Sequence, residues 1–237
     1  MEFLEEFPSM DRKGLRELKI AIDLGFRSFS RTYGDNLEAF FQPLLSFLVW
    51  FEKLLIATPW PIIIFVIALL AWLGARSILV VIGSVVAFLL IGYFGMWQDT
   101  MKTLAIISVS TILCITIGIP LGMWMAKSNR VQSIITPILD IMQTIPSFVY
   151  LIPVVMLLGI GKVPGLIAVC IYAIPPIVRL TNLGIRLVDK DVLEAAEAFG
   201  ANYWQKLFGV QIPLALPNIF AGVNQTIMMA LAMVVIA

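Results

Sequence analysis

The sequence predicts an all-α integral membrane protein, a polytopic helical bundle, and three observations support this fold class. Of its 237 residues, 60% are hydrophobic and only 13% are charged, whereas an ordinary soluble domain is about 45–50% apolar. The mean hydropathy is +0.98, and apolar runs of bilayer length recur along the chain. The net charge is +1 and no basic cluster is present, which excludes nucleic acid as a partner, because phosphate binding needs grouped Lys and Arg.

Six segments are predicted to span the membrane. A helix that crosses the hydrocarbon core needs about 20 mostly apolar residues, and the segments that approach or exceed this length are 57–74, 77–95, 101–125, 137–158, 163–180 and 214–237. The short connections at 74–77 and 95–99 predict antiparallel hairpins. Prolines and glycines recur inside the later spans, and they are tolerated at membrane depth where neighbouring helices cover the backbone. We therefore expect the spans to pack against one another.

The N-terminal residues 1–56 are predicted to form an extracytoplasmic tail. The chain begins with an acidic stretch and lacks the basic and apolar pattern of a cleavable signal peptide. Residues 37–56 mix Phe, Leu and Trp with charged residues, a pattern typical of an amphipathic helix in the membrane interface. The alternative is a seventh, tilted span, in which Glu52 and Lys53 reach the headgroups. That alternative would put the N-terminus inside.

The basic residues near the span ends predict which side faces the cytoplasm. Membrane proteins carry an excess of Lys and Arg in their cytoplasmic loops. If the polar segment 187–217 is cytoplasmic, the short outer loops carry only Lys102 and Lys162. The cytoplasmic side then carries seven basic residues, namely Arg76, Lys127, Arg130, Arg179, Arg186, Lys190 and Lys206. This topology places the N-terminus outside.

The residues that commonly bind metals or form disulfides are scarce. Histidine is absent, and both cysteines, Cys114 and Cys170, lie in apolar runs. The sequence therefore predicts buried thiols, without a disulfide framework or a Cys/His metal site.

The polar segment 187–217 is predicted to contain two short helices. Asp191 and Glu194 have the spacing of a capping box, and Gly200 stands where a helix ends in a left-handed residue. We therefore expect a helix over 192–199 and a second one over 201–208.

Two interpretations of Glu194 and its neighbours remain open. In the structural interpretation, Glu194 caps its helix and Ala195 and Ala196 are simply good helix formers. In the functional one, the two alanines leave a face that another protein can approach closely, and Gly200 fixes the angle of the turn. The two interpretations are compatible, because a partner that pushes on this segment needs a rigid one.

The same segment resembles the EAA signature of ABC-importer permeases. That signature reads EAA, three residues, G, nine residues and I-x-L-P, and here Glu194-Ala195-Ala196, Gly200 and 210–213 match it, with Val210 and Ile212 in place of Ile and Leu. The stretches 140–153 and 221–237 resemble the permease subunit of the glycine betaine/proline importers. The resemblance covers the chain from about residue 57 to its end.

This resemblance implies a fold and a set of partners. It implies a MetI-like permease core over 96–237, two accessory transmembrane helices over 57–95, and a cytoplasmic coupling loop over 187–213. The ATPase-coupling residues would be Glu194, Ala195, Ala196, Gly200 and Pro213. The implied partners in the bacterial inner membrane are a second permease copy, a cytoplasmic ABC ATPase subunit and an extracytoplasmic substrate-binding protein. Because related permeases continue through a further span, we expect the chain to extend past Ala237.

The energy source is expected to be another chain. Gly161-Lys162 is followed by Val163, so no phosphate-binding P-loop is present. We expect no catalytic activity and no cofactor in this chain, with ATP and Mg used by the partner ATPase.

Uncharged polar residues in or near the spans have two possible roles. They are Gln143, Thr144, Ser147, Asn224 and Gln225, with Thr226 beside them. They either line a translocation path or form hydrogen bonds between helices. Asp140 is expected to cap a helix or to pair with Arg179. A quaternary ammonium would favour aromatic rings, but the spans show no clear aromatic cage, so we expect tight recognition to reside in the binding protein.

The predicted function is that of a permease subunit for glycine betaine/proline-type compatible solutes, coupled to ATP hydrolysis in a separate subunit and working by alternating access. The same architecture would also serve choline, carnitine or a sulfonium analogue. A different alternative is a stand-alone secondary transporter, which would need charged residues at the membrane midplane for ion coupling.

Overall fold

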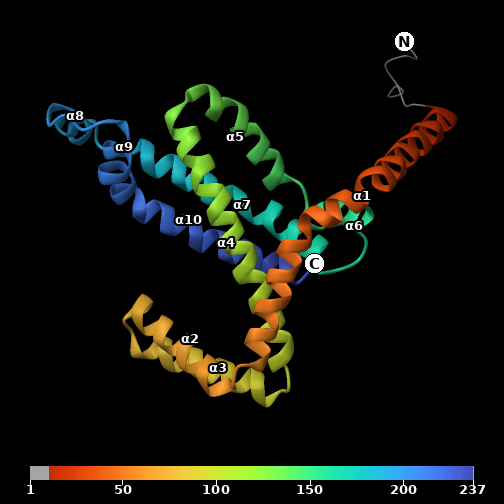
Figure 1. Cartoon of the computed structure of the whole chain (residues 1–237), viewed down its shortest axis with the longest axis horizontal. Helices are drawn as coiled ribbons and strands as arrows, with labels where there is room; N and C mark the ends of the chain where they lie inside the picture. Colours follow the sequence, from red (N-terminus) through yellow and green to blue (C-terminus); the bar gives the residue numbers. More distant parts are fainter. Residues whose placement is uncertain (1–10, 237) are drawn as a thin grey trace, which may run out of the picture.

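The computed structural model describes residues 11–236, without the side chains of residues 26, 27, 29–31, 33, 35, 37 and 38. Within this range every regular element is a helix, as predicted (Figure 1). The elements are α1 (Arg12–Ala57), α2 (Trp60–Ala75), α3 (Ile78–Tyr93), α4 (Trp97–Lys127), α5 (Asn129–Thr144), α6 (Ser147–Leu158), α7 (Lys162–Arg186), α8 (Lys190–Ala198), α9 (Tyr203–Lys206), the π-helical turn η2 (Leu207–Gln211) and α10 (Ile212–Val234). The first ten residues of the predicted tail lie outside the described range.

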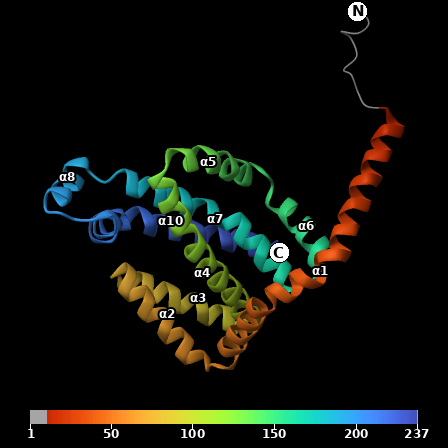
Figure 2. The same cartoon turned by 45° about the horizontal axis from the view of Figure 1, so that its top comes forward.

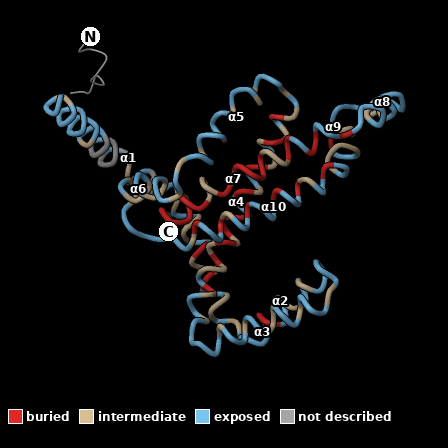
Figure 3. The backbone as a smooth tube through the Cα atoms, turned by 180° about the vertical axis from the view of Figure 1, so that it is seen from behind, coloured by how far each residue is buried: buried red, intermediate tan, exposed pale blue. Residues whose placement is uncertain are grey.

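The core of the described chain lies where α4, α7 and α10 pack together. Buried residues concentrate along these three helices (Figure 3). A Cβ added at Gly122 of α4 would lie 2.7 Å from the carbonyl oxygen of Val178 in α7, and one added at Gly222 of α10 would lie 3.1 Å from Ile177 Cα. Small residues at membrane-helix interfaces let the backbones approach closely. The expectation that the spans pack against one another is therefore confirmed for these three helices.

Three predicted spans form helices of membrane-crossing length. They are Trp97–Lys127, Lys162–Arg186 and the stretch Tyr203–Val234. α2 and α3 have 16 residues each, fewer than the roughly 20 that a span needs, so their crossing stays a prediction. α7 continues six residues beyond the predicted end at 180, so Arg186 as well as Arg179 lies inside this helix.

The span predicted over 137–158 is not one continuous helix, and whether the broken segment crosses the membrane stays a prediction. The structure has two helices there, α5 and α6, whose axes differ by 97°. The break falls at Ile145 and Pro146, because proline has no N–H to donate and pushes the residue before it into extended backbone, where Ile145 lies at ψ 131°. Tyr150 Oη donates a 2.6 Å hydrogen bond to the Met142 carbonyl oxygen, which satisfies one carbonyl in the last turn of α5.

α1 is one helix of 46 residues. Its segment Ala39–Ala57 is long and apolar enough to cross a membrane, which favours the seventh-span alternative, while the interfacial placement of 37–56 stays a prediction. Leu48 is buried in a cluster with residues of α4 and α7. Glu52 is also buried, and it accepts a hydrogen bond from Lys162 Nζ at 2.6 Å. The end of α1 is therefore attached to the start of α7.

α2 and α3 form the first predicted hairpin, which stands away from the core (Figure 1). The second predicted hairpin is open, because α3 and α4 touch mainly near their connection, where the Phe88 and Trp97 rings are 6.4 Å apart. α4 then packs along α1 and α7 instead of along α3. The two accessory helices therefore extend from the core as an arm.

Candidate coupling loop and transport path

The first helix of the polar segment, α8, begins two residues earlier than predicted. Its N-cap is Asp189, whose side chain accepts a 3.0 Å hydrogen bond from the Asp191 backbone N–H. The predicted capping box of Asp191 and Glu194 is therefore wrong. With Lys190 as the first helical residue, Glu194 is the fifth, too far along the helix to reach the N-cap backbone. Within the described residues the exposed Glu194 side chain makes no hydrogen bond and no ion pair.

The glycine stop after α8 is confirmed. Gly200 has φ 77°, in the left-handed region. The Gly200 N–H donates to the Glu197 carbonyl at 2.8 Å, and the Ala201 N–H donates to the Ala196 carbonyl at 3.0 Å. This pair of bonds is a Schellman motif. The motif satisfies two carbonyls at the helix end and sets the direction in which the chain leaves α8.

The second predicted helix, over 201–208, is shorter in the structure and continues differently. α9 contains only Tyr203–Lys206, and the π-helical turn η2 then joins it to α10 without a break. Asn202 caps α9 through a reciprocal box with Gln205, at 2.9 and 2.8 Å. The Asn-x-x-Gln spacing is a local signal that could have located this start. The π-helical turn has no comparable signal in the sequence.

Side-chain contacts attach the loop to itself and to α4. Lys206 forms an ion pair with Glu197, so α8 and α9 are linked across the turn. Lys127 Nζ at the end of α4 lies 4.5 Å from the centre of the Tyr203 ring, within the range of a cation–π contact. Arg186 Nη2 donates to the Met125 carbonyl at 2.8 Å. α8 is therefore connected through α9 to the end of α4, and the end of α4 is connected to the end of α7.

The loop exposes a small apolar surface. Phe199 is 93% exposed and Trp204 is 63% exposed, and the Trp204 and Phe208 rings stack with their centres 5.9 Å apart. Ala195 beside them is exposed and Ala196 is half-buried. Pro213 is exposed in the first turn of α10, where a missing N–H costs little. An exposed apolar patch on a polar loop is a feature of protein docking sites.

The predicted path residues fall into two groups. Gln143 and Thr144 end α5 and Ser147 begins α6, so these three meet at the helix break. Asn224 and Gln225 are exposed on α10, and α7 runs between the two groups (Figures 1 and 2). Among the described residues, none of the five side chains makes a hydrogen bond to another helix. Thr144 does make one, but it donates to the Ile141 carbonyl of its own helix at 3.0 Å. The interhelical hydrogen bonds considered from the sequence are therefore not found.

Two polar links hold α5 to α7. Arg179 pairs with Asp140, which confirms the predicted pairing. Arg186 Nη1 donates a 2.8 Å hydrogen bond to Asn129 Oδ1, and its Nε donates to Asn182 Oδ1 at 3.0 Å. The start and the last third of α5 are thus both tied to α7 by charged groups.

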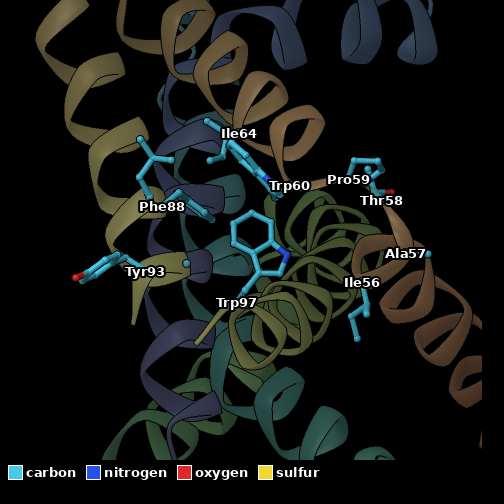
Figure 4. Close-up of a pocket in the computed structure, with 11 residues that line it drawn as sticks. Ile56, Ala57, Thr58, Pro59, Trp60, Ile64, Phe88, Tyr93 and Trp97 are labelled. Atoms are coloured by element: carbon cyan, nitrogen blue, oxygen red, sulfur yellow. The ribbon is translucent and has the colours of Figure 1, made fainter. Parts of the chain in front are cut away.

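Sequence reasoning missed an aromatic pocket at the base of the α2–α3 arm. The pocket has a volume of about 620 Å³ and is lined by the rings of Trp60, Phe88, Tyr93 and Trp97, with Trp97 in the middle (Figure 4). None of its lining residues is charged. These rings come from three helices, and Trp60 lies 28 residues before Phe88 in the sequence, so no local pattern shows that the rings meet.

The two cysteines lie between α4 and α7. Cys114 Sγ is 3.5 Å from the Cys170 carbonyl oxygen, and both thiols are free. They pack as apolar groups at the centre of the bundle.

Comparison with known proteins identifies the family. Residues 118–237 match the family of binding-protein-dependent transport system inner membrane components. The chain belongs to this family of permeases. The match includes the whole segment 187–213 that is predicted to be the coupling loop, and it confirms the MetI-like core over the matched residues. With its several apolar helices, the permease is a multi-pass inner membrane protein.

Relatives of the permease carry names that state their cargo. Over 187 residues it is 51% identical to the glycine betaine/proline betaine transport system permease protein ProW of Escherichia coli (strain K12), covering 79% of this chain and 52% of ProW. It is 50% identical over 181 residues to the glycine betaine/carnitine transport permease protein GbuB of Listeria monocytogenes serotype 1/2a (strain 10403S), covering 76% and 64%. It is 44% identical over 216 residues to the glycine betaine transport system permease protein OpuAB of Bacillus subtilis (strain 168), covering 91% and 74%. The chain therefore spans about half of the length of ProW.

Proposed function

We propose that this chain is the non-catalytic permease subunit of an ATP-binding cassette importer for glycine betaine and related trimethylammonium zwitterions. The observation that carries the proposal is the loop of α8 and α9. It is a short helix with a fixed glycine stop, it exposes Phe199 and Trp204, and it is linked to α4 through Lys127. A rigid protrusion of this kind suits a subunit that receives a mechanical push from a separate ATPase.

The proposed docking partner of the loop is a cytoplasmic ABC ATPase, which binds ATP and Mg. Ala195 and Ala196 offer a face with little side-chain bulk, and the neighbouring rings supply apolar contact area. The turn between α2 and α3, the junction of α4 and α5, and α8 lie toward one end of the molecule (Figure 2), and Arg76, Lys127 and Lys190 lie in these places. A cytoplasmic position for this basic end agrees with the positive-inside rule. An extracytoplasmic substrate-binding protein would then dock at the opposite end. The N-terminus lies on that outer side if residues 37–56 lie in the membrane interface, and on the inner side if they form a seventh span.

We further propose that a second copy of the permease completes the path. Asn224 and Gln225 are exposed on α10, and Gln143 is exposed on α5. Polar side chains at membrane depth usually face protein or a water-filled cavity and not lipid. A homodimer would cover these residues and leave a polar route between the two copies.

The names of the relatives support a zwitterionic cargo. ProW and OpuAB are named for betaines and GbuB also for carnitine. Glycine betaine and carnitine each carry a trimethylammonium group and a carboxylate. We therefore favour this chemical class over purely cationic choline.

The proposal can be tested by reconstitution. The permease would be placed in vesicles with its ATPase on one side and its binding protein on the other, and uptake of radiolabelled glycine betaine would be measured with and without ATP. We expect uptake that requires ATP, the ATPase and the binding protein together. Uptake that continues without the ATPase would support a stand-alone transporter and overturn the proposal.

A further inference from the structure

The Asp140–Arg179 ion pair lies on the polar side of α5, next to the helix break. We propose that this pair is a substrate-binding subsite within the permease, which recognises a zwitterion by exchanging its own internal ion pair for two ion pairs with the substrate. The inference rests on the proposed function, because it takes the cargo to be a trimethylammonium carboxylate.

The first supporting observation is the division of α5 into separate faces. Leu139 is buried in the core, and Val131, Ile135 and Met142 pack against that core; their spacing places them on one side of the helix. A polar stripe runs along another side, at intervals of three or four residues. It consists of Asn129, Ser133, Thr136, Asp140, Gln143 and Thr144. The stripe is exposed except for the half-buried Thr136, so a polar surface continues along the helix up to its break.

The second observation is that the ion pair has unused bonding capacity. The Asp140 side chain is 55% exposed and the Arg179 side chain is 36% exposed. A guanidinium has five N–H donors and a carboxylate has two acceptor oxygens, yet one nitrogen of Arg179 contacts one oxygen of Asp140. Arg179 Nε is buried and has no partner among the described residues. Because Nε is buried, a further ligand would be met by the remaining Nη donors of the partly exposed Arg179 side chain and by the second oxygen of Asp140.

The third observation is the position of the helix break. α5 ends at Thr144, one turn beyond Asp140, and α6 begins at Ser147 in a different direction. Irregular backbone at membrane depth is tolerated where it is buried in protein or lines a water-filled cavity. Discontinuous helices also supply substrate sites in other transporters. The exposed Gln143 side chain lies within one turn of Asp140 on the same stripe.

The chemistry of a betaine fits these groups. Its carboxylate can accept two parallel hydrogen bonds from the Arg179 guanidinium. Its trimethylammonium group has no N–H to donate, so its attraction to the Asp140 carboxylate is purely electrostatic. When a zwitterion binds, each charge of the pair gains an opposite charge, and the site stays neutral before and after. A cation such as choline has no carboxylate for Arg179, so it would take Asp140 from Arg179 without supplying an opposite charge in return.

The test compares variants of the pair in the reconstituted complex with ATPase and binding protein. We expect Arg179→Gln and Asp140→Asn each to lower glycine betaine uptake per ATP hydrolysed by at least tenfold, with normal membrane insertion and basal ATPase activity. The matched control is Lys162→Gln, which removes a different ion pair of α7, the one with Glu52 of α1. It should leave the uptake per ATP within twofold of the wild type. Uptake within twofold of the wild type in both pair variants would overturn the subsite.

A charge swap separates recognition from simple helix tethering. The double variant Asp140→Arg with Arg179→Asp restores an ion pair between α5 and α7, so thermal stability should return to the wild-type value. If the pair recognises the substrate in one orientation, uptake should stay at least tenfold reduced, because each substrate charge now meets a like charge. Restoration of uptake to more than half of the wild-type rate would show a purely structural pair and overturn the inference. Failure of the proposed function would look different, since the wild-type complex itself would then show no ATP-dependent uptake.

Discussion

Glycine serves opposite purposes in the bundle core and in the coupling loop. At Gly122 the space is full, since an added Cβ would lie 2.6 Å from Thr181 Cβ and 2.7 Å from the Val178 carbonyl oxygen. At Gly200 the space is empty, with no atom within 4 Å of an added Cβ, but φ is +77°. The core needs glycine because helices approach each other there, whereas the loop needs it because the backbone turns there. The core is thus held by packing and the loop by conformation, so the two should fail in different ways.

The largest effect is expected from a substitution in the core. Gly122→Val would force α4 away from backbone atoms of α7, and such overpacking costs about 1–3 kcal/mol or more. We expect a large loss of folded, monodisperse protein after extraction, measured by fluorescence-detected size-exclusion chromatography and by thermal unfolding. The control is Gly83→Val in α3, where no atom lies within 4 Å of an added Cβ. Equal stability of the two variants would show that α4 and α7 do not pack as described.

The second-largest effect is expected from a substitution in the turn after α8. In Gly200→Val a branched side chain must adopt the left-handed region, at about 1–2 kcal/mol for an ordinary residue. We expect the protein to remain folded in the membrane but to lose most ATP-driven uptake, because α8 no longer keeps its angle to α9. Gly209→Val is the control, since its site is also open but lacks a positive φ. Normal coupling in the Gly200 variant would remove the argument that the turn must be rigid.

The third prediction tests the exposed ring at the tip of the loop. If Phe199 anchors the ATPase, Phe199→Ala should weaken ATPase binding by about tenfold or more, as truncation of an aromatic interface anchor does. Binding of purified ATPase to the permease in nanodiscs would be measured. Phe220→Ala provides a control, because Phe220 is an exposed ring on α10 outside the loop. An unchanged affinity for the Phe199 variant would move the docking surface elsewhere.

Features that depend on neighbouring residues, and one pairing of opposite charges, could be predicted from the sequence, whereas other contacts between distant helices could not. The left-handed stop at Gly200 and the Asp140–Arg179 pair were predictable. The stop depends on a local conformational rule, and the pair depends on the attraction between two opposite charges near the same end of their predicted spans. The break between α5 and α6 also had a local signal in Pro146, but the apolar length of 137–158 outweighed it. Lys127 beneath the Tyr203 ring depends on how α4 and α9 meet in space, which no local pattern encodes.

The smallest effect is expected at the helix start, where two carboxylates compete for the same role. The structure gives the N-cap to Asp189 and leaves Glu194 exposed without a partner among the described residues. Asp189→Ala should therefore destabilise α8 by about 1 kcal/mol, seen as roughly fivefold faster hydrogen exchange of its amides, whereas Glu194→Ala should leave that exchange unchanged. If Glu194→Ala accelerated the hydrogen exchange of the α8 amides as much as Asp189→Ala, Glu194 would also stabilise the start of the helix, contrary to the structure. If Glu194→Ala instead impaired uptake without changing the exchange, the Glu194 carboxylate would act on the partner subunit and not on its own helix.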